Sequence, residues 1–227
     1  ISFRGKNYLI DTGGARYENK IAEKFLFPTL KVRGISKIDG IFLSHFDEDH
    51  AGNLNKILKK YKVENIFINH LPEDSEILAD AKKFSNLVML KKADKLKICD
   101  DTKVEVISDA ENRQNENDNS MVLLVNHKGF KTLFTGDISA DVEKEIKNKI
   151  DILKVPHHGS ETSTSYELLK NTEPRFAVIS AGVNNSYGHP HKVTLQSLER
   201  HGIIYYVTSR DGEVDFKIYD DKLSVDT

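Results

Sequence analysis

Short apolar runs and segments with helical periodicity alternate along the chain. The apolar runs are rich in aliphatic and β-branched residues and are bounded by turn residues, which predicts strands. The predicted strands are Tyr8–Ile10, Gly40–Leu43, Asn65–Ile68, Val104–Ile107, Met121–Val125, Thr132–Phe134, Ile152–Val155, Phe176–Ile179, Ile203–Val207 and Val214–Ile218. Most of these runs are short and apolar, as buried strands are.

Between these runs lie segments in which apolar residues recur at helical spacing. The predicted helices are Leu54–Tyr61, Asp74–Phe84, Ala140–Ile150, Ser165–Lys170 and Val193–Arg200. Because strands and helices are mixed throughout, we expect an α+β fold in which helices pack on sheets. The most polar stretch, Asp109–Asn119, predicts a surface loop between two strands.

Size and composition favour one globular domain over residues 1–227. The chain has 227 residues, of which 38% are hydrophobic, enough to bury a substantial core. No apolar run is long enough to span a membrane. The apolar alternation of Ile1-Ser2-Phe3 indicates that the chain starts inside a strand, so we expect a domain excised from a longer protein. The only cysteine, Cys99, excludes an internal disulfide and a cysteine-rich zinc site, so histidines and carboxylates must hold any metal.

The charge balance gives no general attraction for nucleic acid. The formal net charge is −2 and the sequence pI is near 6.5, which argues against a non-specific DNA clamp. Lysines gather in two groups, for which we favour a solvated surface face over a DNA track. The groups are Lys56, Lys59, Lys60 and Lys62, and Lys82, Lys83, Lys91, Lys92, Lys95 and Lys97.

The densest cluster of ionisable residues is the segment 43–52, LSHFDEDHAG. In it an apolar strand runs directly into His45, Asp47, Asp49 and His50. Side chains alternate at a strand end, and the following turn redirects the later ones, so one segment can furnish ligands to two neighbouring cations. The alternative is a charged strand-to-helix loop in which Asp49 caps the next helix.

A second apolar strand ends in Gly136-Asp137. A carboxylate at a strand end offers two oxygens and can bridge two divalent ions. The alternative is an ordinary turn in which Asp137 or Ser139 caps the following helix.

Two further strands end in histidines. Val155 leads through Pro156 into the pair His157-His158, in which one ring can bind metal while the other transfers a proton. His189 precedes Pro190, which we expect to begin the last long helix. The remaining histidines expected at the surface or in loops are His70, His127 and His201.

Taken in order, these motifs resemble those of the metallo-β-lactamase superfamily. The segment 9–14 (LIDTGG) is similar to its first motif, whose aspartate, here Asp11, supports the metal loop. The segment 45–50 is similar to the second motif, Asp137 to the bridging aspartate, and His157, His158 and His189 to the later histidines. The resemblance implies an αββα sandwich, with two mixed β-sheets covered by helices on both outer faces.

Within the superfamily, the chain is similar to the carboxy-terminal domain of ComEC-type competence proteins, membrane channels that import single-stranded DNA. The residues that carry this likeness are the segments 44–50, 117–120, 154–160 and 187–190. The form His-x-Asp-x-Asp-His is shared with phosphorylcholine esterases. The resemblance implies DNA, most simply single-stranded, as substrate, the rest of a membrane channel as partner, and an extracytoplasmic location.

The chain departs from the superfamily pattern at two ligand positions. Asp47 stands where most members carry histidine, and the usual histidine before the bridging aspartate has no recognisable counterpart. We therefore expect His157 or His158 to replace it. The implied ligand sets are His45, Asp47 and one of His157 and His158 for one ion, and Asp49, His50 and His189 for the other, with Asp137 bridging.

The resemblance implies two divalent metal ions, zinc or manganese, which activate water and hold a phosphate in line. The histidine of the 157–158 pair that is not a ligand would protonate the departing oxygen, and we count Asp49, His157 and His158 as catalytic. The implied activity is a nuclease that degrades the DNA strand left outside during uptake. Candidate stacking platforms for bases are Tyr166, Tyr187, Tyr205 and Tyr206.

Two alternatives remain. A small-molecule phosphodiesterase of the phosphorylcholine-esterase kind would need an aromatic cage for a quaternary ammonium, and the chain has no tryptophan. A non-catalytic domain that guides DNA to the channel would not need intact metal ligands, yet the ligand motifs are complete.

Overall fold

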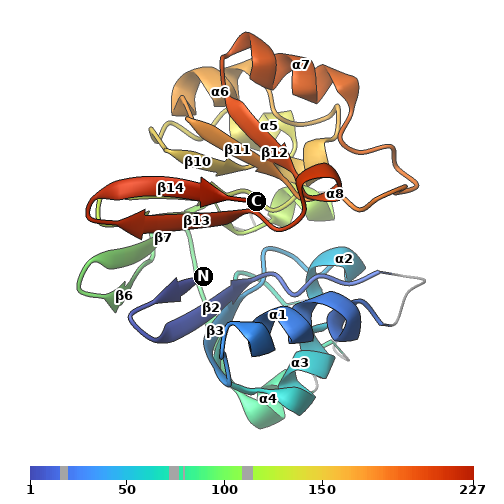
Figure 1. Cartoon of the computed structure of the whole chain (residues 1–227). Helices are drawn as coiled ribbons and strands as arrows, with labels where there is room; N and C mark the ends of the chain where they lie inside the picture. Colours follow the sequence, from blue (N-terminus) through green and yellow to red (C-terminus); the bar gives the residue numbers. More distant parts are fainter. Residues whose placement is uncertain (16–19, 72–76, 79, 109–114) are drawn as a thin grey trace. The chain divides into compact units, whose positions relative to one another are not determined.

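The computed structural model describes residues 1–15, 20–71, 77–78, 80–108 and 115–227 (Figure 1). The described residues form two compact units. Unit 1 comprises residues 1–92, and unit 2 comprises residues 93–108 and 115–227. The prediction of a single domain over residues 1–227 stays a prediction.

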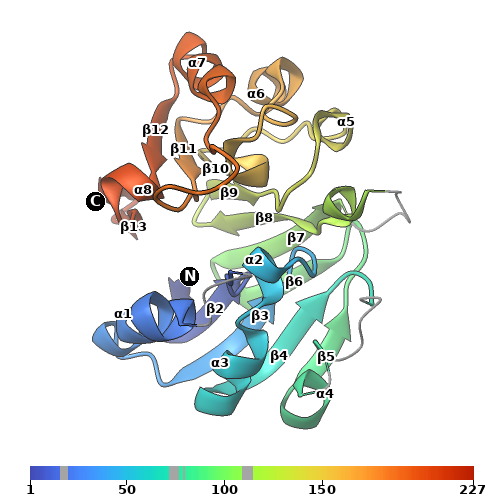
Figure 2. The ribbon, with the colours of Figure 1, turned by 90° about the vertical axis from the view of Figure 1, so that its right-hand side faces the viewer.

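Unit 1 contains a five-stranded sheet in the order β1-β2-β3-β4-β5. The strands are β1 (Ser2–Phe3), β2 (Lys6–Ile10), β3 (Lys37–Phe42), β4 (Lys62–Ile68) and β5 (Asn86–Met89). The strands β2 to β5 are mutually parallel and lie side by side in Figure 2. Their carboxyl ends therefore meet at one edge of the sheet.

Short helices bury their apolar side chains against this sheet. They are η1 (Ala22–Leu26), α1 (Phe27–Val32), α2 (Glu48–Ala51), α3 (Leu54–Lys60) and α4 (Ala81–Phe84). Leu54 and Ile57 of α3 are fully buried in one core with Ile38 and Ile41 of β3. Burying such a side chain stabilises the fold by about 1.5–3 kcal/mol, so α3 anchors the segment that carries the first cluster of ionisable residues.

Unit 2 contains a seven-stranded sheet in the order β12-β11-β10-β9-β8-β7-β6. The strands are β6 (Lys95–Cys99), β7 (Thr102–Ser108), β8 (Val122–His127), β9 (Phe130–Phe134), β10 (Ile152–Lys154), β11 (Phe176–Ile179) and β12 (Ile204–Val207). From β6 to β9 the pairing is antiparallel, and from β9 to β12 it is parallel. The strand β9 is thus the boundary between the two halves of the sheet.

The helices of unit 2 are η2 (Glu116–Asn119), α5 (Ala140–Glu143), η3 (Pro156–Gly159), α6 (Tyr166–Thr172), α7 (Lys192–Arg200) and α8 (Thr208–Asp211). Of these, α5, α6 and α7 share one core with the sheet. Leu168 of α6 and Leu198 of α7 are fully buried with Leu153 and Ala177 of the sheet. A hairpin of β13 (Asp215–Tyr219) and β14 (Lys222–Asp226) ends the chain.

The structure confirms each predicted strand to within three residues at its ends. The strand expected at the first residues is β1, whereas sequence reasoning missed β5, β6, β14 and the helical segment η1–α1. The predicted helix Ala140–Ile150 is wrong beyond Glu143, because the next buried apolar residues, Ile146 and Ile150, pack without helical backbone.

Two further predictions are confirmed only in part, and a third is wrong. Of the predicted helix Asp74–Phe84 only α4 is formed, and residues 72–76 and 79 lie outside the described residues. Residues 116–119 of the predicted polar loop form η2, while residues 109–114 are also outside. Pro190 does not begin the last long helix, which starts at Lys192 with His191 at its N-cap.

Lysines of the two groups noted in the sequence lie beside carboxylates. The pairs are Lys56–Glu23, Lys59–Asp80, Lys83–Asp80, Lys95–Glu105 and Lys97–Asp100, at 2.8–3.9 Å. This pairing favours a solvated face over a DNA track. In the part of the chain that is described, no helix is long and apolar enough to cross a membrane.

Candidate metal centre

In unit 1, the residues that follow β2 and β3 are joined through Asp11. The backbone N–H of Asp11 donates to the carbonyl of Phe42 at 2.8 Å, which holds the two strand ends together. The Asp11 carboxylate accepts hydrogen bonds from the Ser44 backbone N–H at 2.7 Å and the Ser44 hydroxyl at 2.9 Å, and it contacts Nδ1 of His50 at 2.7 Å. One carboxylate therefore orients the whole segment that begins at Ser44.

These contacts assign the protons of the His45 and His50 rings. A carboxylate only accepts, so Nδ1 of His50 carries the proton and a neutral ring has its lone pair on Nε2. The Ser44 hydroxyl gives its single proton to Asp11, so His45 Nδ1, 3.0 Å from that hydroxyl, must donate to it. Both rings are buried, and each has its Nε2 available as a metal ligand.

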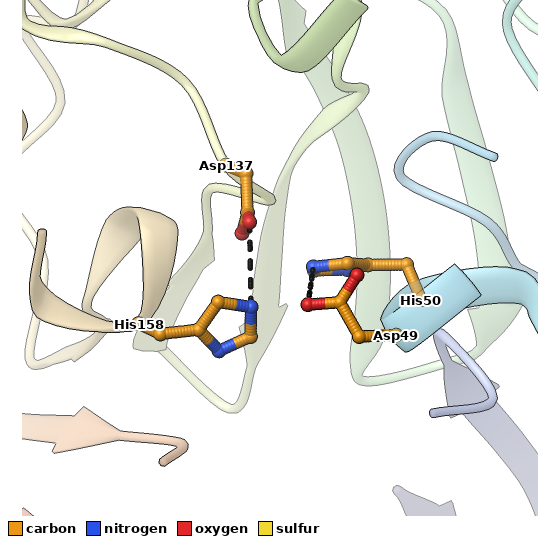
Figure 3. A group of neighbouring side chains, drawn as sticks. All are labelled: Asp49, His50, Asp137 and His158. Atoms are coloured by element: carbon orange, nitrogen blue, oxygen red, sulfur yellow. Dashed lines mark ion pairs between the residues drawn. The ribbon is translucent and has the colours of Figure 1, made fainter. Parts of the chain in front are cut away.

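Two half-exposed carboxylates lie next to these Nε2 atoms. Oδ2 of Asp47 is 3.8 Å from Nε2 of His45, and Oδ2 of Asp49 is 3.9 Å from Nε2 of His50 (Figure 3 draws the second pair). A cation bound at about 2.0–2.2 Å from an imidazole nitrogen and a carboxylate oxygen fits such separations. Asp49 lies inside α2, whose N-cap is Asp47, so the interpretation of Asp49 as a helix cap is wrong.

The pKa of Asp11 reflects its place beneath the histidines. Burial by itself raises this pKa, but the charge of His50 and the hydrogen bonds from His50 and Ser44 outweigh it, and the pKa falls below its usual 3.8. Asp11 is therefore ionised near neutral pH. An ionised partner on Nδ1 raises the basicity of the opposite ring nitrogen, which strengthens it as a ligand.

In unit 2, Asp137 lies directly beyond β9. Gly136 has φ 55°, a left-handed conformation that glycine adopts without steric cost and that turns the chain out of the strand. The backbone N–H of Asp137 donates to the Ser120 hydroxyl at 3.1 Å. The buried carboxylate has the ammonium of Lys154 3.7 Å from Oδ1 and the ring of His158 3.3 Å from Oδ2.

The contact between His158 and Asp137 shows whether the residues of unit 2 suit a bound cation (Figure 3). Nδ1 of His158 lies 2.7 Å from the carbonyl oxygen of Ser180, which can only accept, so Nδ1 carries the proton. In the neutral ring, Nε2 then presents a lone pair to the carboxylate oxygen 3.3 Å away. Two acceptors face each other, and either a second proton or a cation must lie between them. The donor set of unit 2 fits a divalent cation.

His157 is placed differently from His158. Both have left-handed backbone, with φ 47° and 52°, a conformation that costs a non-glycine residue about 1–2 kcal/mol and is typical of functional sites. Nε2 of His157 lies 3.5 Å from the side-chain amide of Asn117, and its ring is 5.7 Å from that of His189. The adjacent histidines thus both lie near His189, but their Nε2 atoms face different groups, the Asn117 amide for His157 and Asp137 for His158.

His189 is held by the side chain of Asn185. The Asn185 amide donates to the His189 carbonyl at 2.6 Å, and its oxygen accepts from the His189 backbone N–H at 2.9 Å. Burial and the neighbouring imidazoles, His157 foremost, lower the pKa of His189 below its usual 6.5. The ring is therefore neutral at neutral pH, the form that binds metal.

The predicted ligands fall into one set in each unit. The set in unit 1 consists of His45, Asp47, Asp49 and His50. The set in unit 2 consists of Asp137, His157, His158 and His189. Each of Asp49, His50, Asp137 and His158 offers one ligand atom. The other histidines have other partners: His70 contacts Asn69, His127 contacts Thr102, His191 accepts from the Glu161 backbone N–H, and His201 contacts Ser197.

Sequence reasoning gave no role to three residues that support these sets. Asn117 contacts His157, Lys154 contacts Asp137, and Asn185 holds His189. The polarity of residues 115–119 was interpreted as a surface loop. The neighbouring Asp118, which accepts from the Ser139 backbone N–H at 2.7 Å, and Ser120 instead anchor this segment beside Asp137.

Comparison with known proteins identifies the class. The family model of the metallo-beta-lactamase superfamily matches residues 1–183, and the chain belongs to this superfamily. It has the metallo-β-lactamase fold, an α+β arrangement of mixed sheets and helices, as predicted. The crystal structure of the metallo-beta-lactamase fold protein YhfI from Bacillus subtilis matches with TM-score 0.56 and 12% identity, covering 88% of this chain and 83% of that one.

Curated relatives include competence proteins, consistent with the ComEC-type resemblance. ComE operon protein 3 of Bacillus subtilis (strain 168) is 34% identical over 92% of this chain and 30% of its own length. Recombination protein 2 of Haemophilus influenzae is 32% identical over 97% of this chain and 27% of its own length. The chain thus spans somewhat less than a third of the relatives that it matches.

Proposed function

We propose that the chain is a metal-dependent phosphodiesterase that cleaves DNA. The observation that carries this proposal is the pairing of an imidazole lone pair with a carboxylate in both units, at His50 with Asp49 and at His158 with Asp137. Family membership supports it, because the chain carries the ligand motifs of this superfamily in order along its sequence.

The two sets together would hold two divalent cations. In this proposal His45, Asp47, Asp49 and His50 are ligands from unit 1, and Asp137, His158 and His189 are ligands from unit 2, with Asp137 bridging. Of the adjacent histidines we assign His158 as the ligand, because its Nε2 faces Asp137. When bound, such a pair of cations activates water and neutralises charge on a phosphate.

The remaining residues position and protonate. His157, whose Nε2 faces the Asn117 amide and not Asp137, is the candidate to protonate the departing oxygen, a contribution of about 10²–10⁴ in rate. Asp11 keeps the proton of His50 on Nδ1. The ammonium of Lys154 lies 3.4 Å from the Gly136 carbonyl, so it holds the turn that presents Asp137.

Zinc and manganese are the metals that the ligands suit. Imidazoles favour zinc, whereas carboxylates suit harder ions, and Asp47 adds a carboxylate where most of the superfamily has an imidazole. Metal analysis of protein purified without chelator, followed by reconstitution with one metal at a time, identifies the ion that supports turnover.

For the biological role, we propose a nuclease that degrades the strand left outside during DNA uptake. The support is the set of relatives, which includes ComE operon protein 3, Recombination protein 2 and the Competence protein ComA of Neisseria gonorrhoeae. In that setting the chain is an extracytoplasmic part of a larger membrane channel protein, and single-stranded DNA is the substrate.

The activity is tested with plasmid, single-stranded DNA, bis(p-nitrophenyl) phosphate and p-nitrophenyl phosphorylcholine, each with and without metal. Metal-dependent cleavage of DNA supports the nuclease. Hydrolysis of small esters alone supports the small-molecule phosphodiesterase, and DNA binding without turnover supports the guiding domain. Asp137→Asn is the control for contaminating nucleases, because it removes the bridging charge and should abolish turnover.

A further inference from the structure

Three aromatic rings of unit 2 form a parallel series that ends at a proposed metal ligand. The ring of Tyr187 stacks on His189 at 5.6 Å with an interplanar angle of 21°. His189 in turn is nearly parallel to His158, at 6.3 Å and 14°. Nε2 of His158 is the atom that faces Asp137. The series therefore leads from the proposed metal-binding residues to an exposed tyrosine.

The loop that carries Tyr187 is held in place by hydrogen bonds on both sides of it. Asn185 accepts from the Gly188 and His189 backbone N–H groups and donates to the Gly182 carbonyl. Beyond the loop, the backbone N–H of His191 donates to the Gly159 carbonyl at 2.9 Å. These hydrogen bonds position the loop on both sides of Tyr187.

Tyr187 is 76% exposed although one face of its ring rests on His189. Other aromatic residues with possible stacking roles are engaged elsewhere. Tyr166 contacts the His201 ring at a tilt of 52° and lies under Lys170, Tyr205 donates to Glu199, and Tyr206 packs against Phe216. Of these four tyrosines, Tyr187 has an exposed ring that also stacks on His189, a proposed metal ligand.

We propose that Tyr187 stacks on the base of the nucleotide next to the scissile phosphate. This inference rests on the proposed function, because the metal-binding residues must hold that phosphate. Each base has a flat π-face, so a tyrosine platform accepts any sequence. Stacking contributes about 1–3 kcal/mol per base, which corresponds to about 5- to 150-fold in affinity. Tyr187 would make the site select nucleotides over simple phosphodiesters.

The kinetic test compares two esters with the same leaving group. Thymidine 5′-(p-nitrophenyl) phosphate carries a base, and methyl p-nitrophenyl phosphate does not. Tyr187→Ala should lower the ratio of kcat/KM for the first ester over the second by about 5- to 150-fold, mainly through KM. Tyr187→Phe keeps the ring and should keep the ratio. Tyr219→Ala is the matched control, because Tyr219 is also 76% exposed and lies in the terminal hairpin.

A binding test provides a readout other than turnover. A nuclease-resistant phosphorothioate oligonucleotide with one 2-aminopurine is titrated with the metal-loaded chain. Stacking on Tyr187 quenches the 2-aminopurine fluorescence, and Tyr187→Ala should lose both the quenching and about 5- to 150-fold in affinity.

Each outcome decides between the two proposals. An equal effect of Tyr187→Ala on both esters, or none on either, overturns the stacking proposal while the phosphodiesterase stands. If the unsubstituted chain cleaves neither these esters nor DNA, the proposed function fails, and the fluorescence titration alone judges stacking. Quenching that survives in Tyr187→Ala places the base elsewhere and overturns the proposal.

Discussion

The Nδ1 atom of His158 lies 2.7 Å from the carbonyl oxygen of Ser180, and this contact determines which ring nitrogen faces Asp137. A metal-binding role for Nε2 follows from it. His158→Gln should therefore lose up to one metal ion per chain, and turnover should fall by more than the roughly 10- to 100-fold that follows loss of a partner outside the ligand set. Metal content after dialysis, measured by mass spectrometry, checks the prediction.

The chain offers a matched control for this substitution. Nδ1 of His201 also lies close to a carbonyl oxygen, that of Ser197, at 2.8 Å, in a half-buried position at the end of α7. His201→Gln should keep its full metal content. If His158→Gln also keeps it, the assignment of His158 as a ligand is wrong.

Asp11 should affect metal binding without touching the metal. In Asp11→Asn the amide can no longer accept all the hydrogen bonds that the carboxylate accepts from Ser44 and His50, and the charge beneath the ring is lost. We expect metal affinity to fall by about 10- to 100-fold. Titration with a competing metal-sensitive dye measures it.

Asp39→Asn separates this effect from a general loss of stability. The Asp39 side chain is 16% exposed and the Asp11 side chain 17%, and both carboxylates accept a backbone N–H, but the partners of Asp39 are Asn7 and Lys37. This variant should unfold more easily and bind metal with unchanged affinity. Equal loss of affinity in both variants would mean that Asp11 acts only through folding.

The fold and the ligands were predictable to different degrees. Leu43 and Val155 belong to apolar runs that are buried on any plausible packing, so the strands before His45 and His157 could be predicted from residue type alone. The length of α5 could not, because Ile146 and Ile150 keep a helical spacing while the backbone leaves the helix after Glu143. Tertiary burial decided that segment, not local propensity.

The candidate ligands carried strong signals because ionisable residues are dense at strand ends. Which of His157 and His158 faces Asp137 depended on two consecutive left-handed residues, and sequence does not reveal such a turn. The contact of Asn117 with His157 could not be predicted from the sequence for a similar reason. A polar run predicts a loop equally well whether it faces water or contacts a buried histidine.

Glu143 should give the stability of the chain a specific dependence on pH. This fully buried side chain accepts the backbone N–H groups of Thr164 at 2.6 Å and Ser165 at 2.7 Å. Burial raises its pKa above the usual 4.5 despite these hydrogen bonds. Because the pKa of Glu143 is higher in the folded chain than in the unfolded chain, its protonated side chain stabilises the fold. This stabilisation is complete below pH 4.5, the usual pKa, and is lost as the pH rises through the pKa of the folded state.

Urea unfolding of the chain and of Glu143→Gln across pH 4 to 7 tests this. The amide does not titrate, so the advantage of the unsubstituted chain should be largest at the acid end and shrink as pH rises. Glu143→Gln also places an amide N–H against a backbone donor, which costs about 1–3 kcal/mol for an unsatisfied group. A difference that stays constant over the range would contradict the raised pKa.

Gly159 should be needed for the position of His189. A Cβ atom there would lie 2.7 Å from Cβ of Pro190 and would also be strained at φ 81°. Gly159→Ala should lose about 1–2 kcal/mol from the left-handed backbone and in addition bind metal more weakly. Gly202→Ala has the same kind of backbone, φ 68°, with nothing within 4 Å of its Cβ, so it should lose stability alone.

The change of strand direction at β9 bears on how the chain folds. The meander from β6 to β9 pairs neighbours in sequence, whereas β10 to β12 require crossover connections, and contacts at short sequence separation form sooner. Asp137 follows β9, the last strand of the meander that should form first. His158 and His189 follow β10 and β11, which should pair later. Metal should therefore bind only after the rate-limiting step of folding. Bound metal should slow unfolding and leave the folding rate nearly unchanged. Stopped-flow measurements of both rates against denaturant concentration, with and without metal, check this prediction.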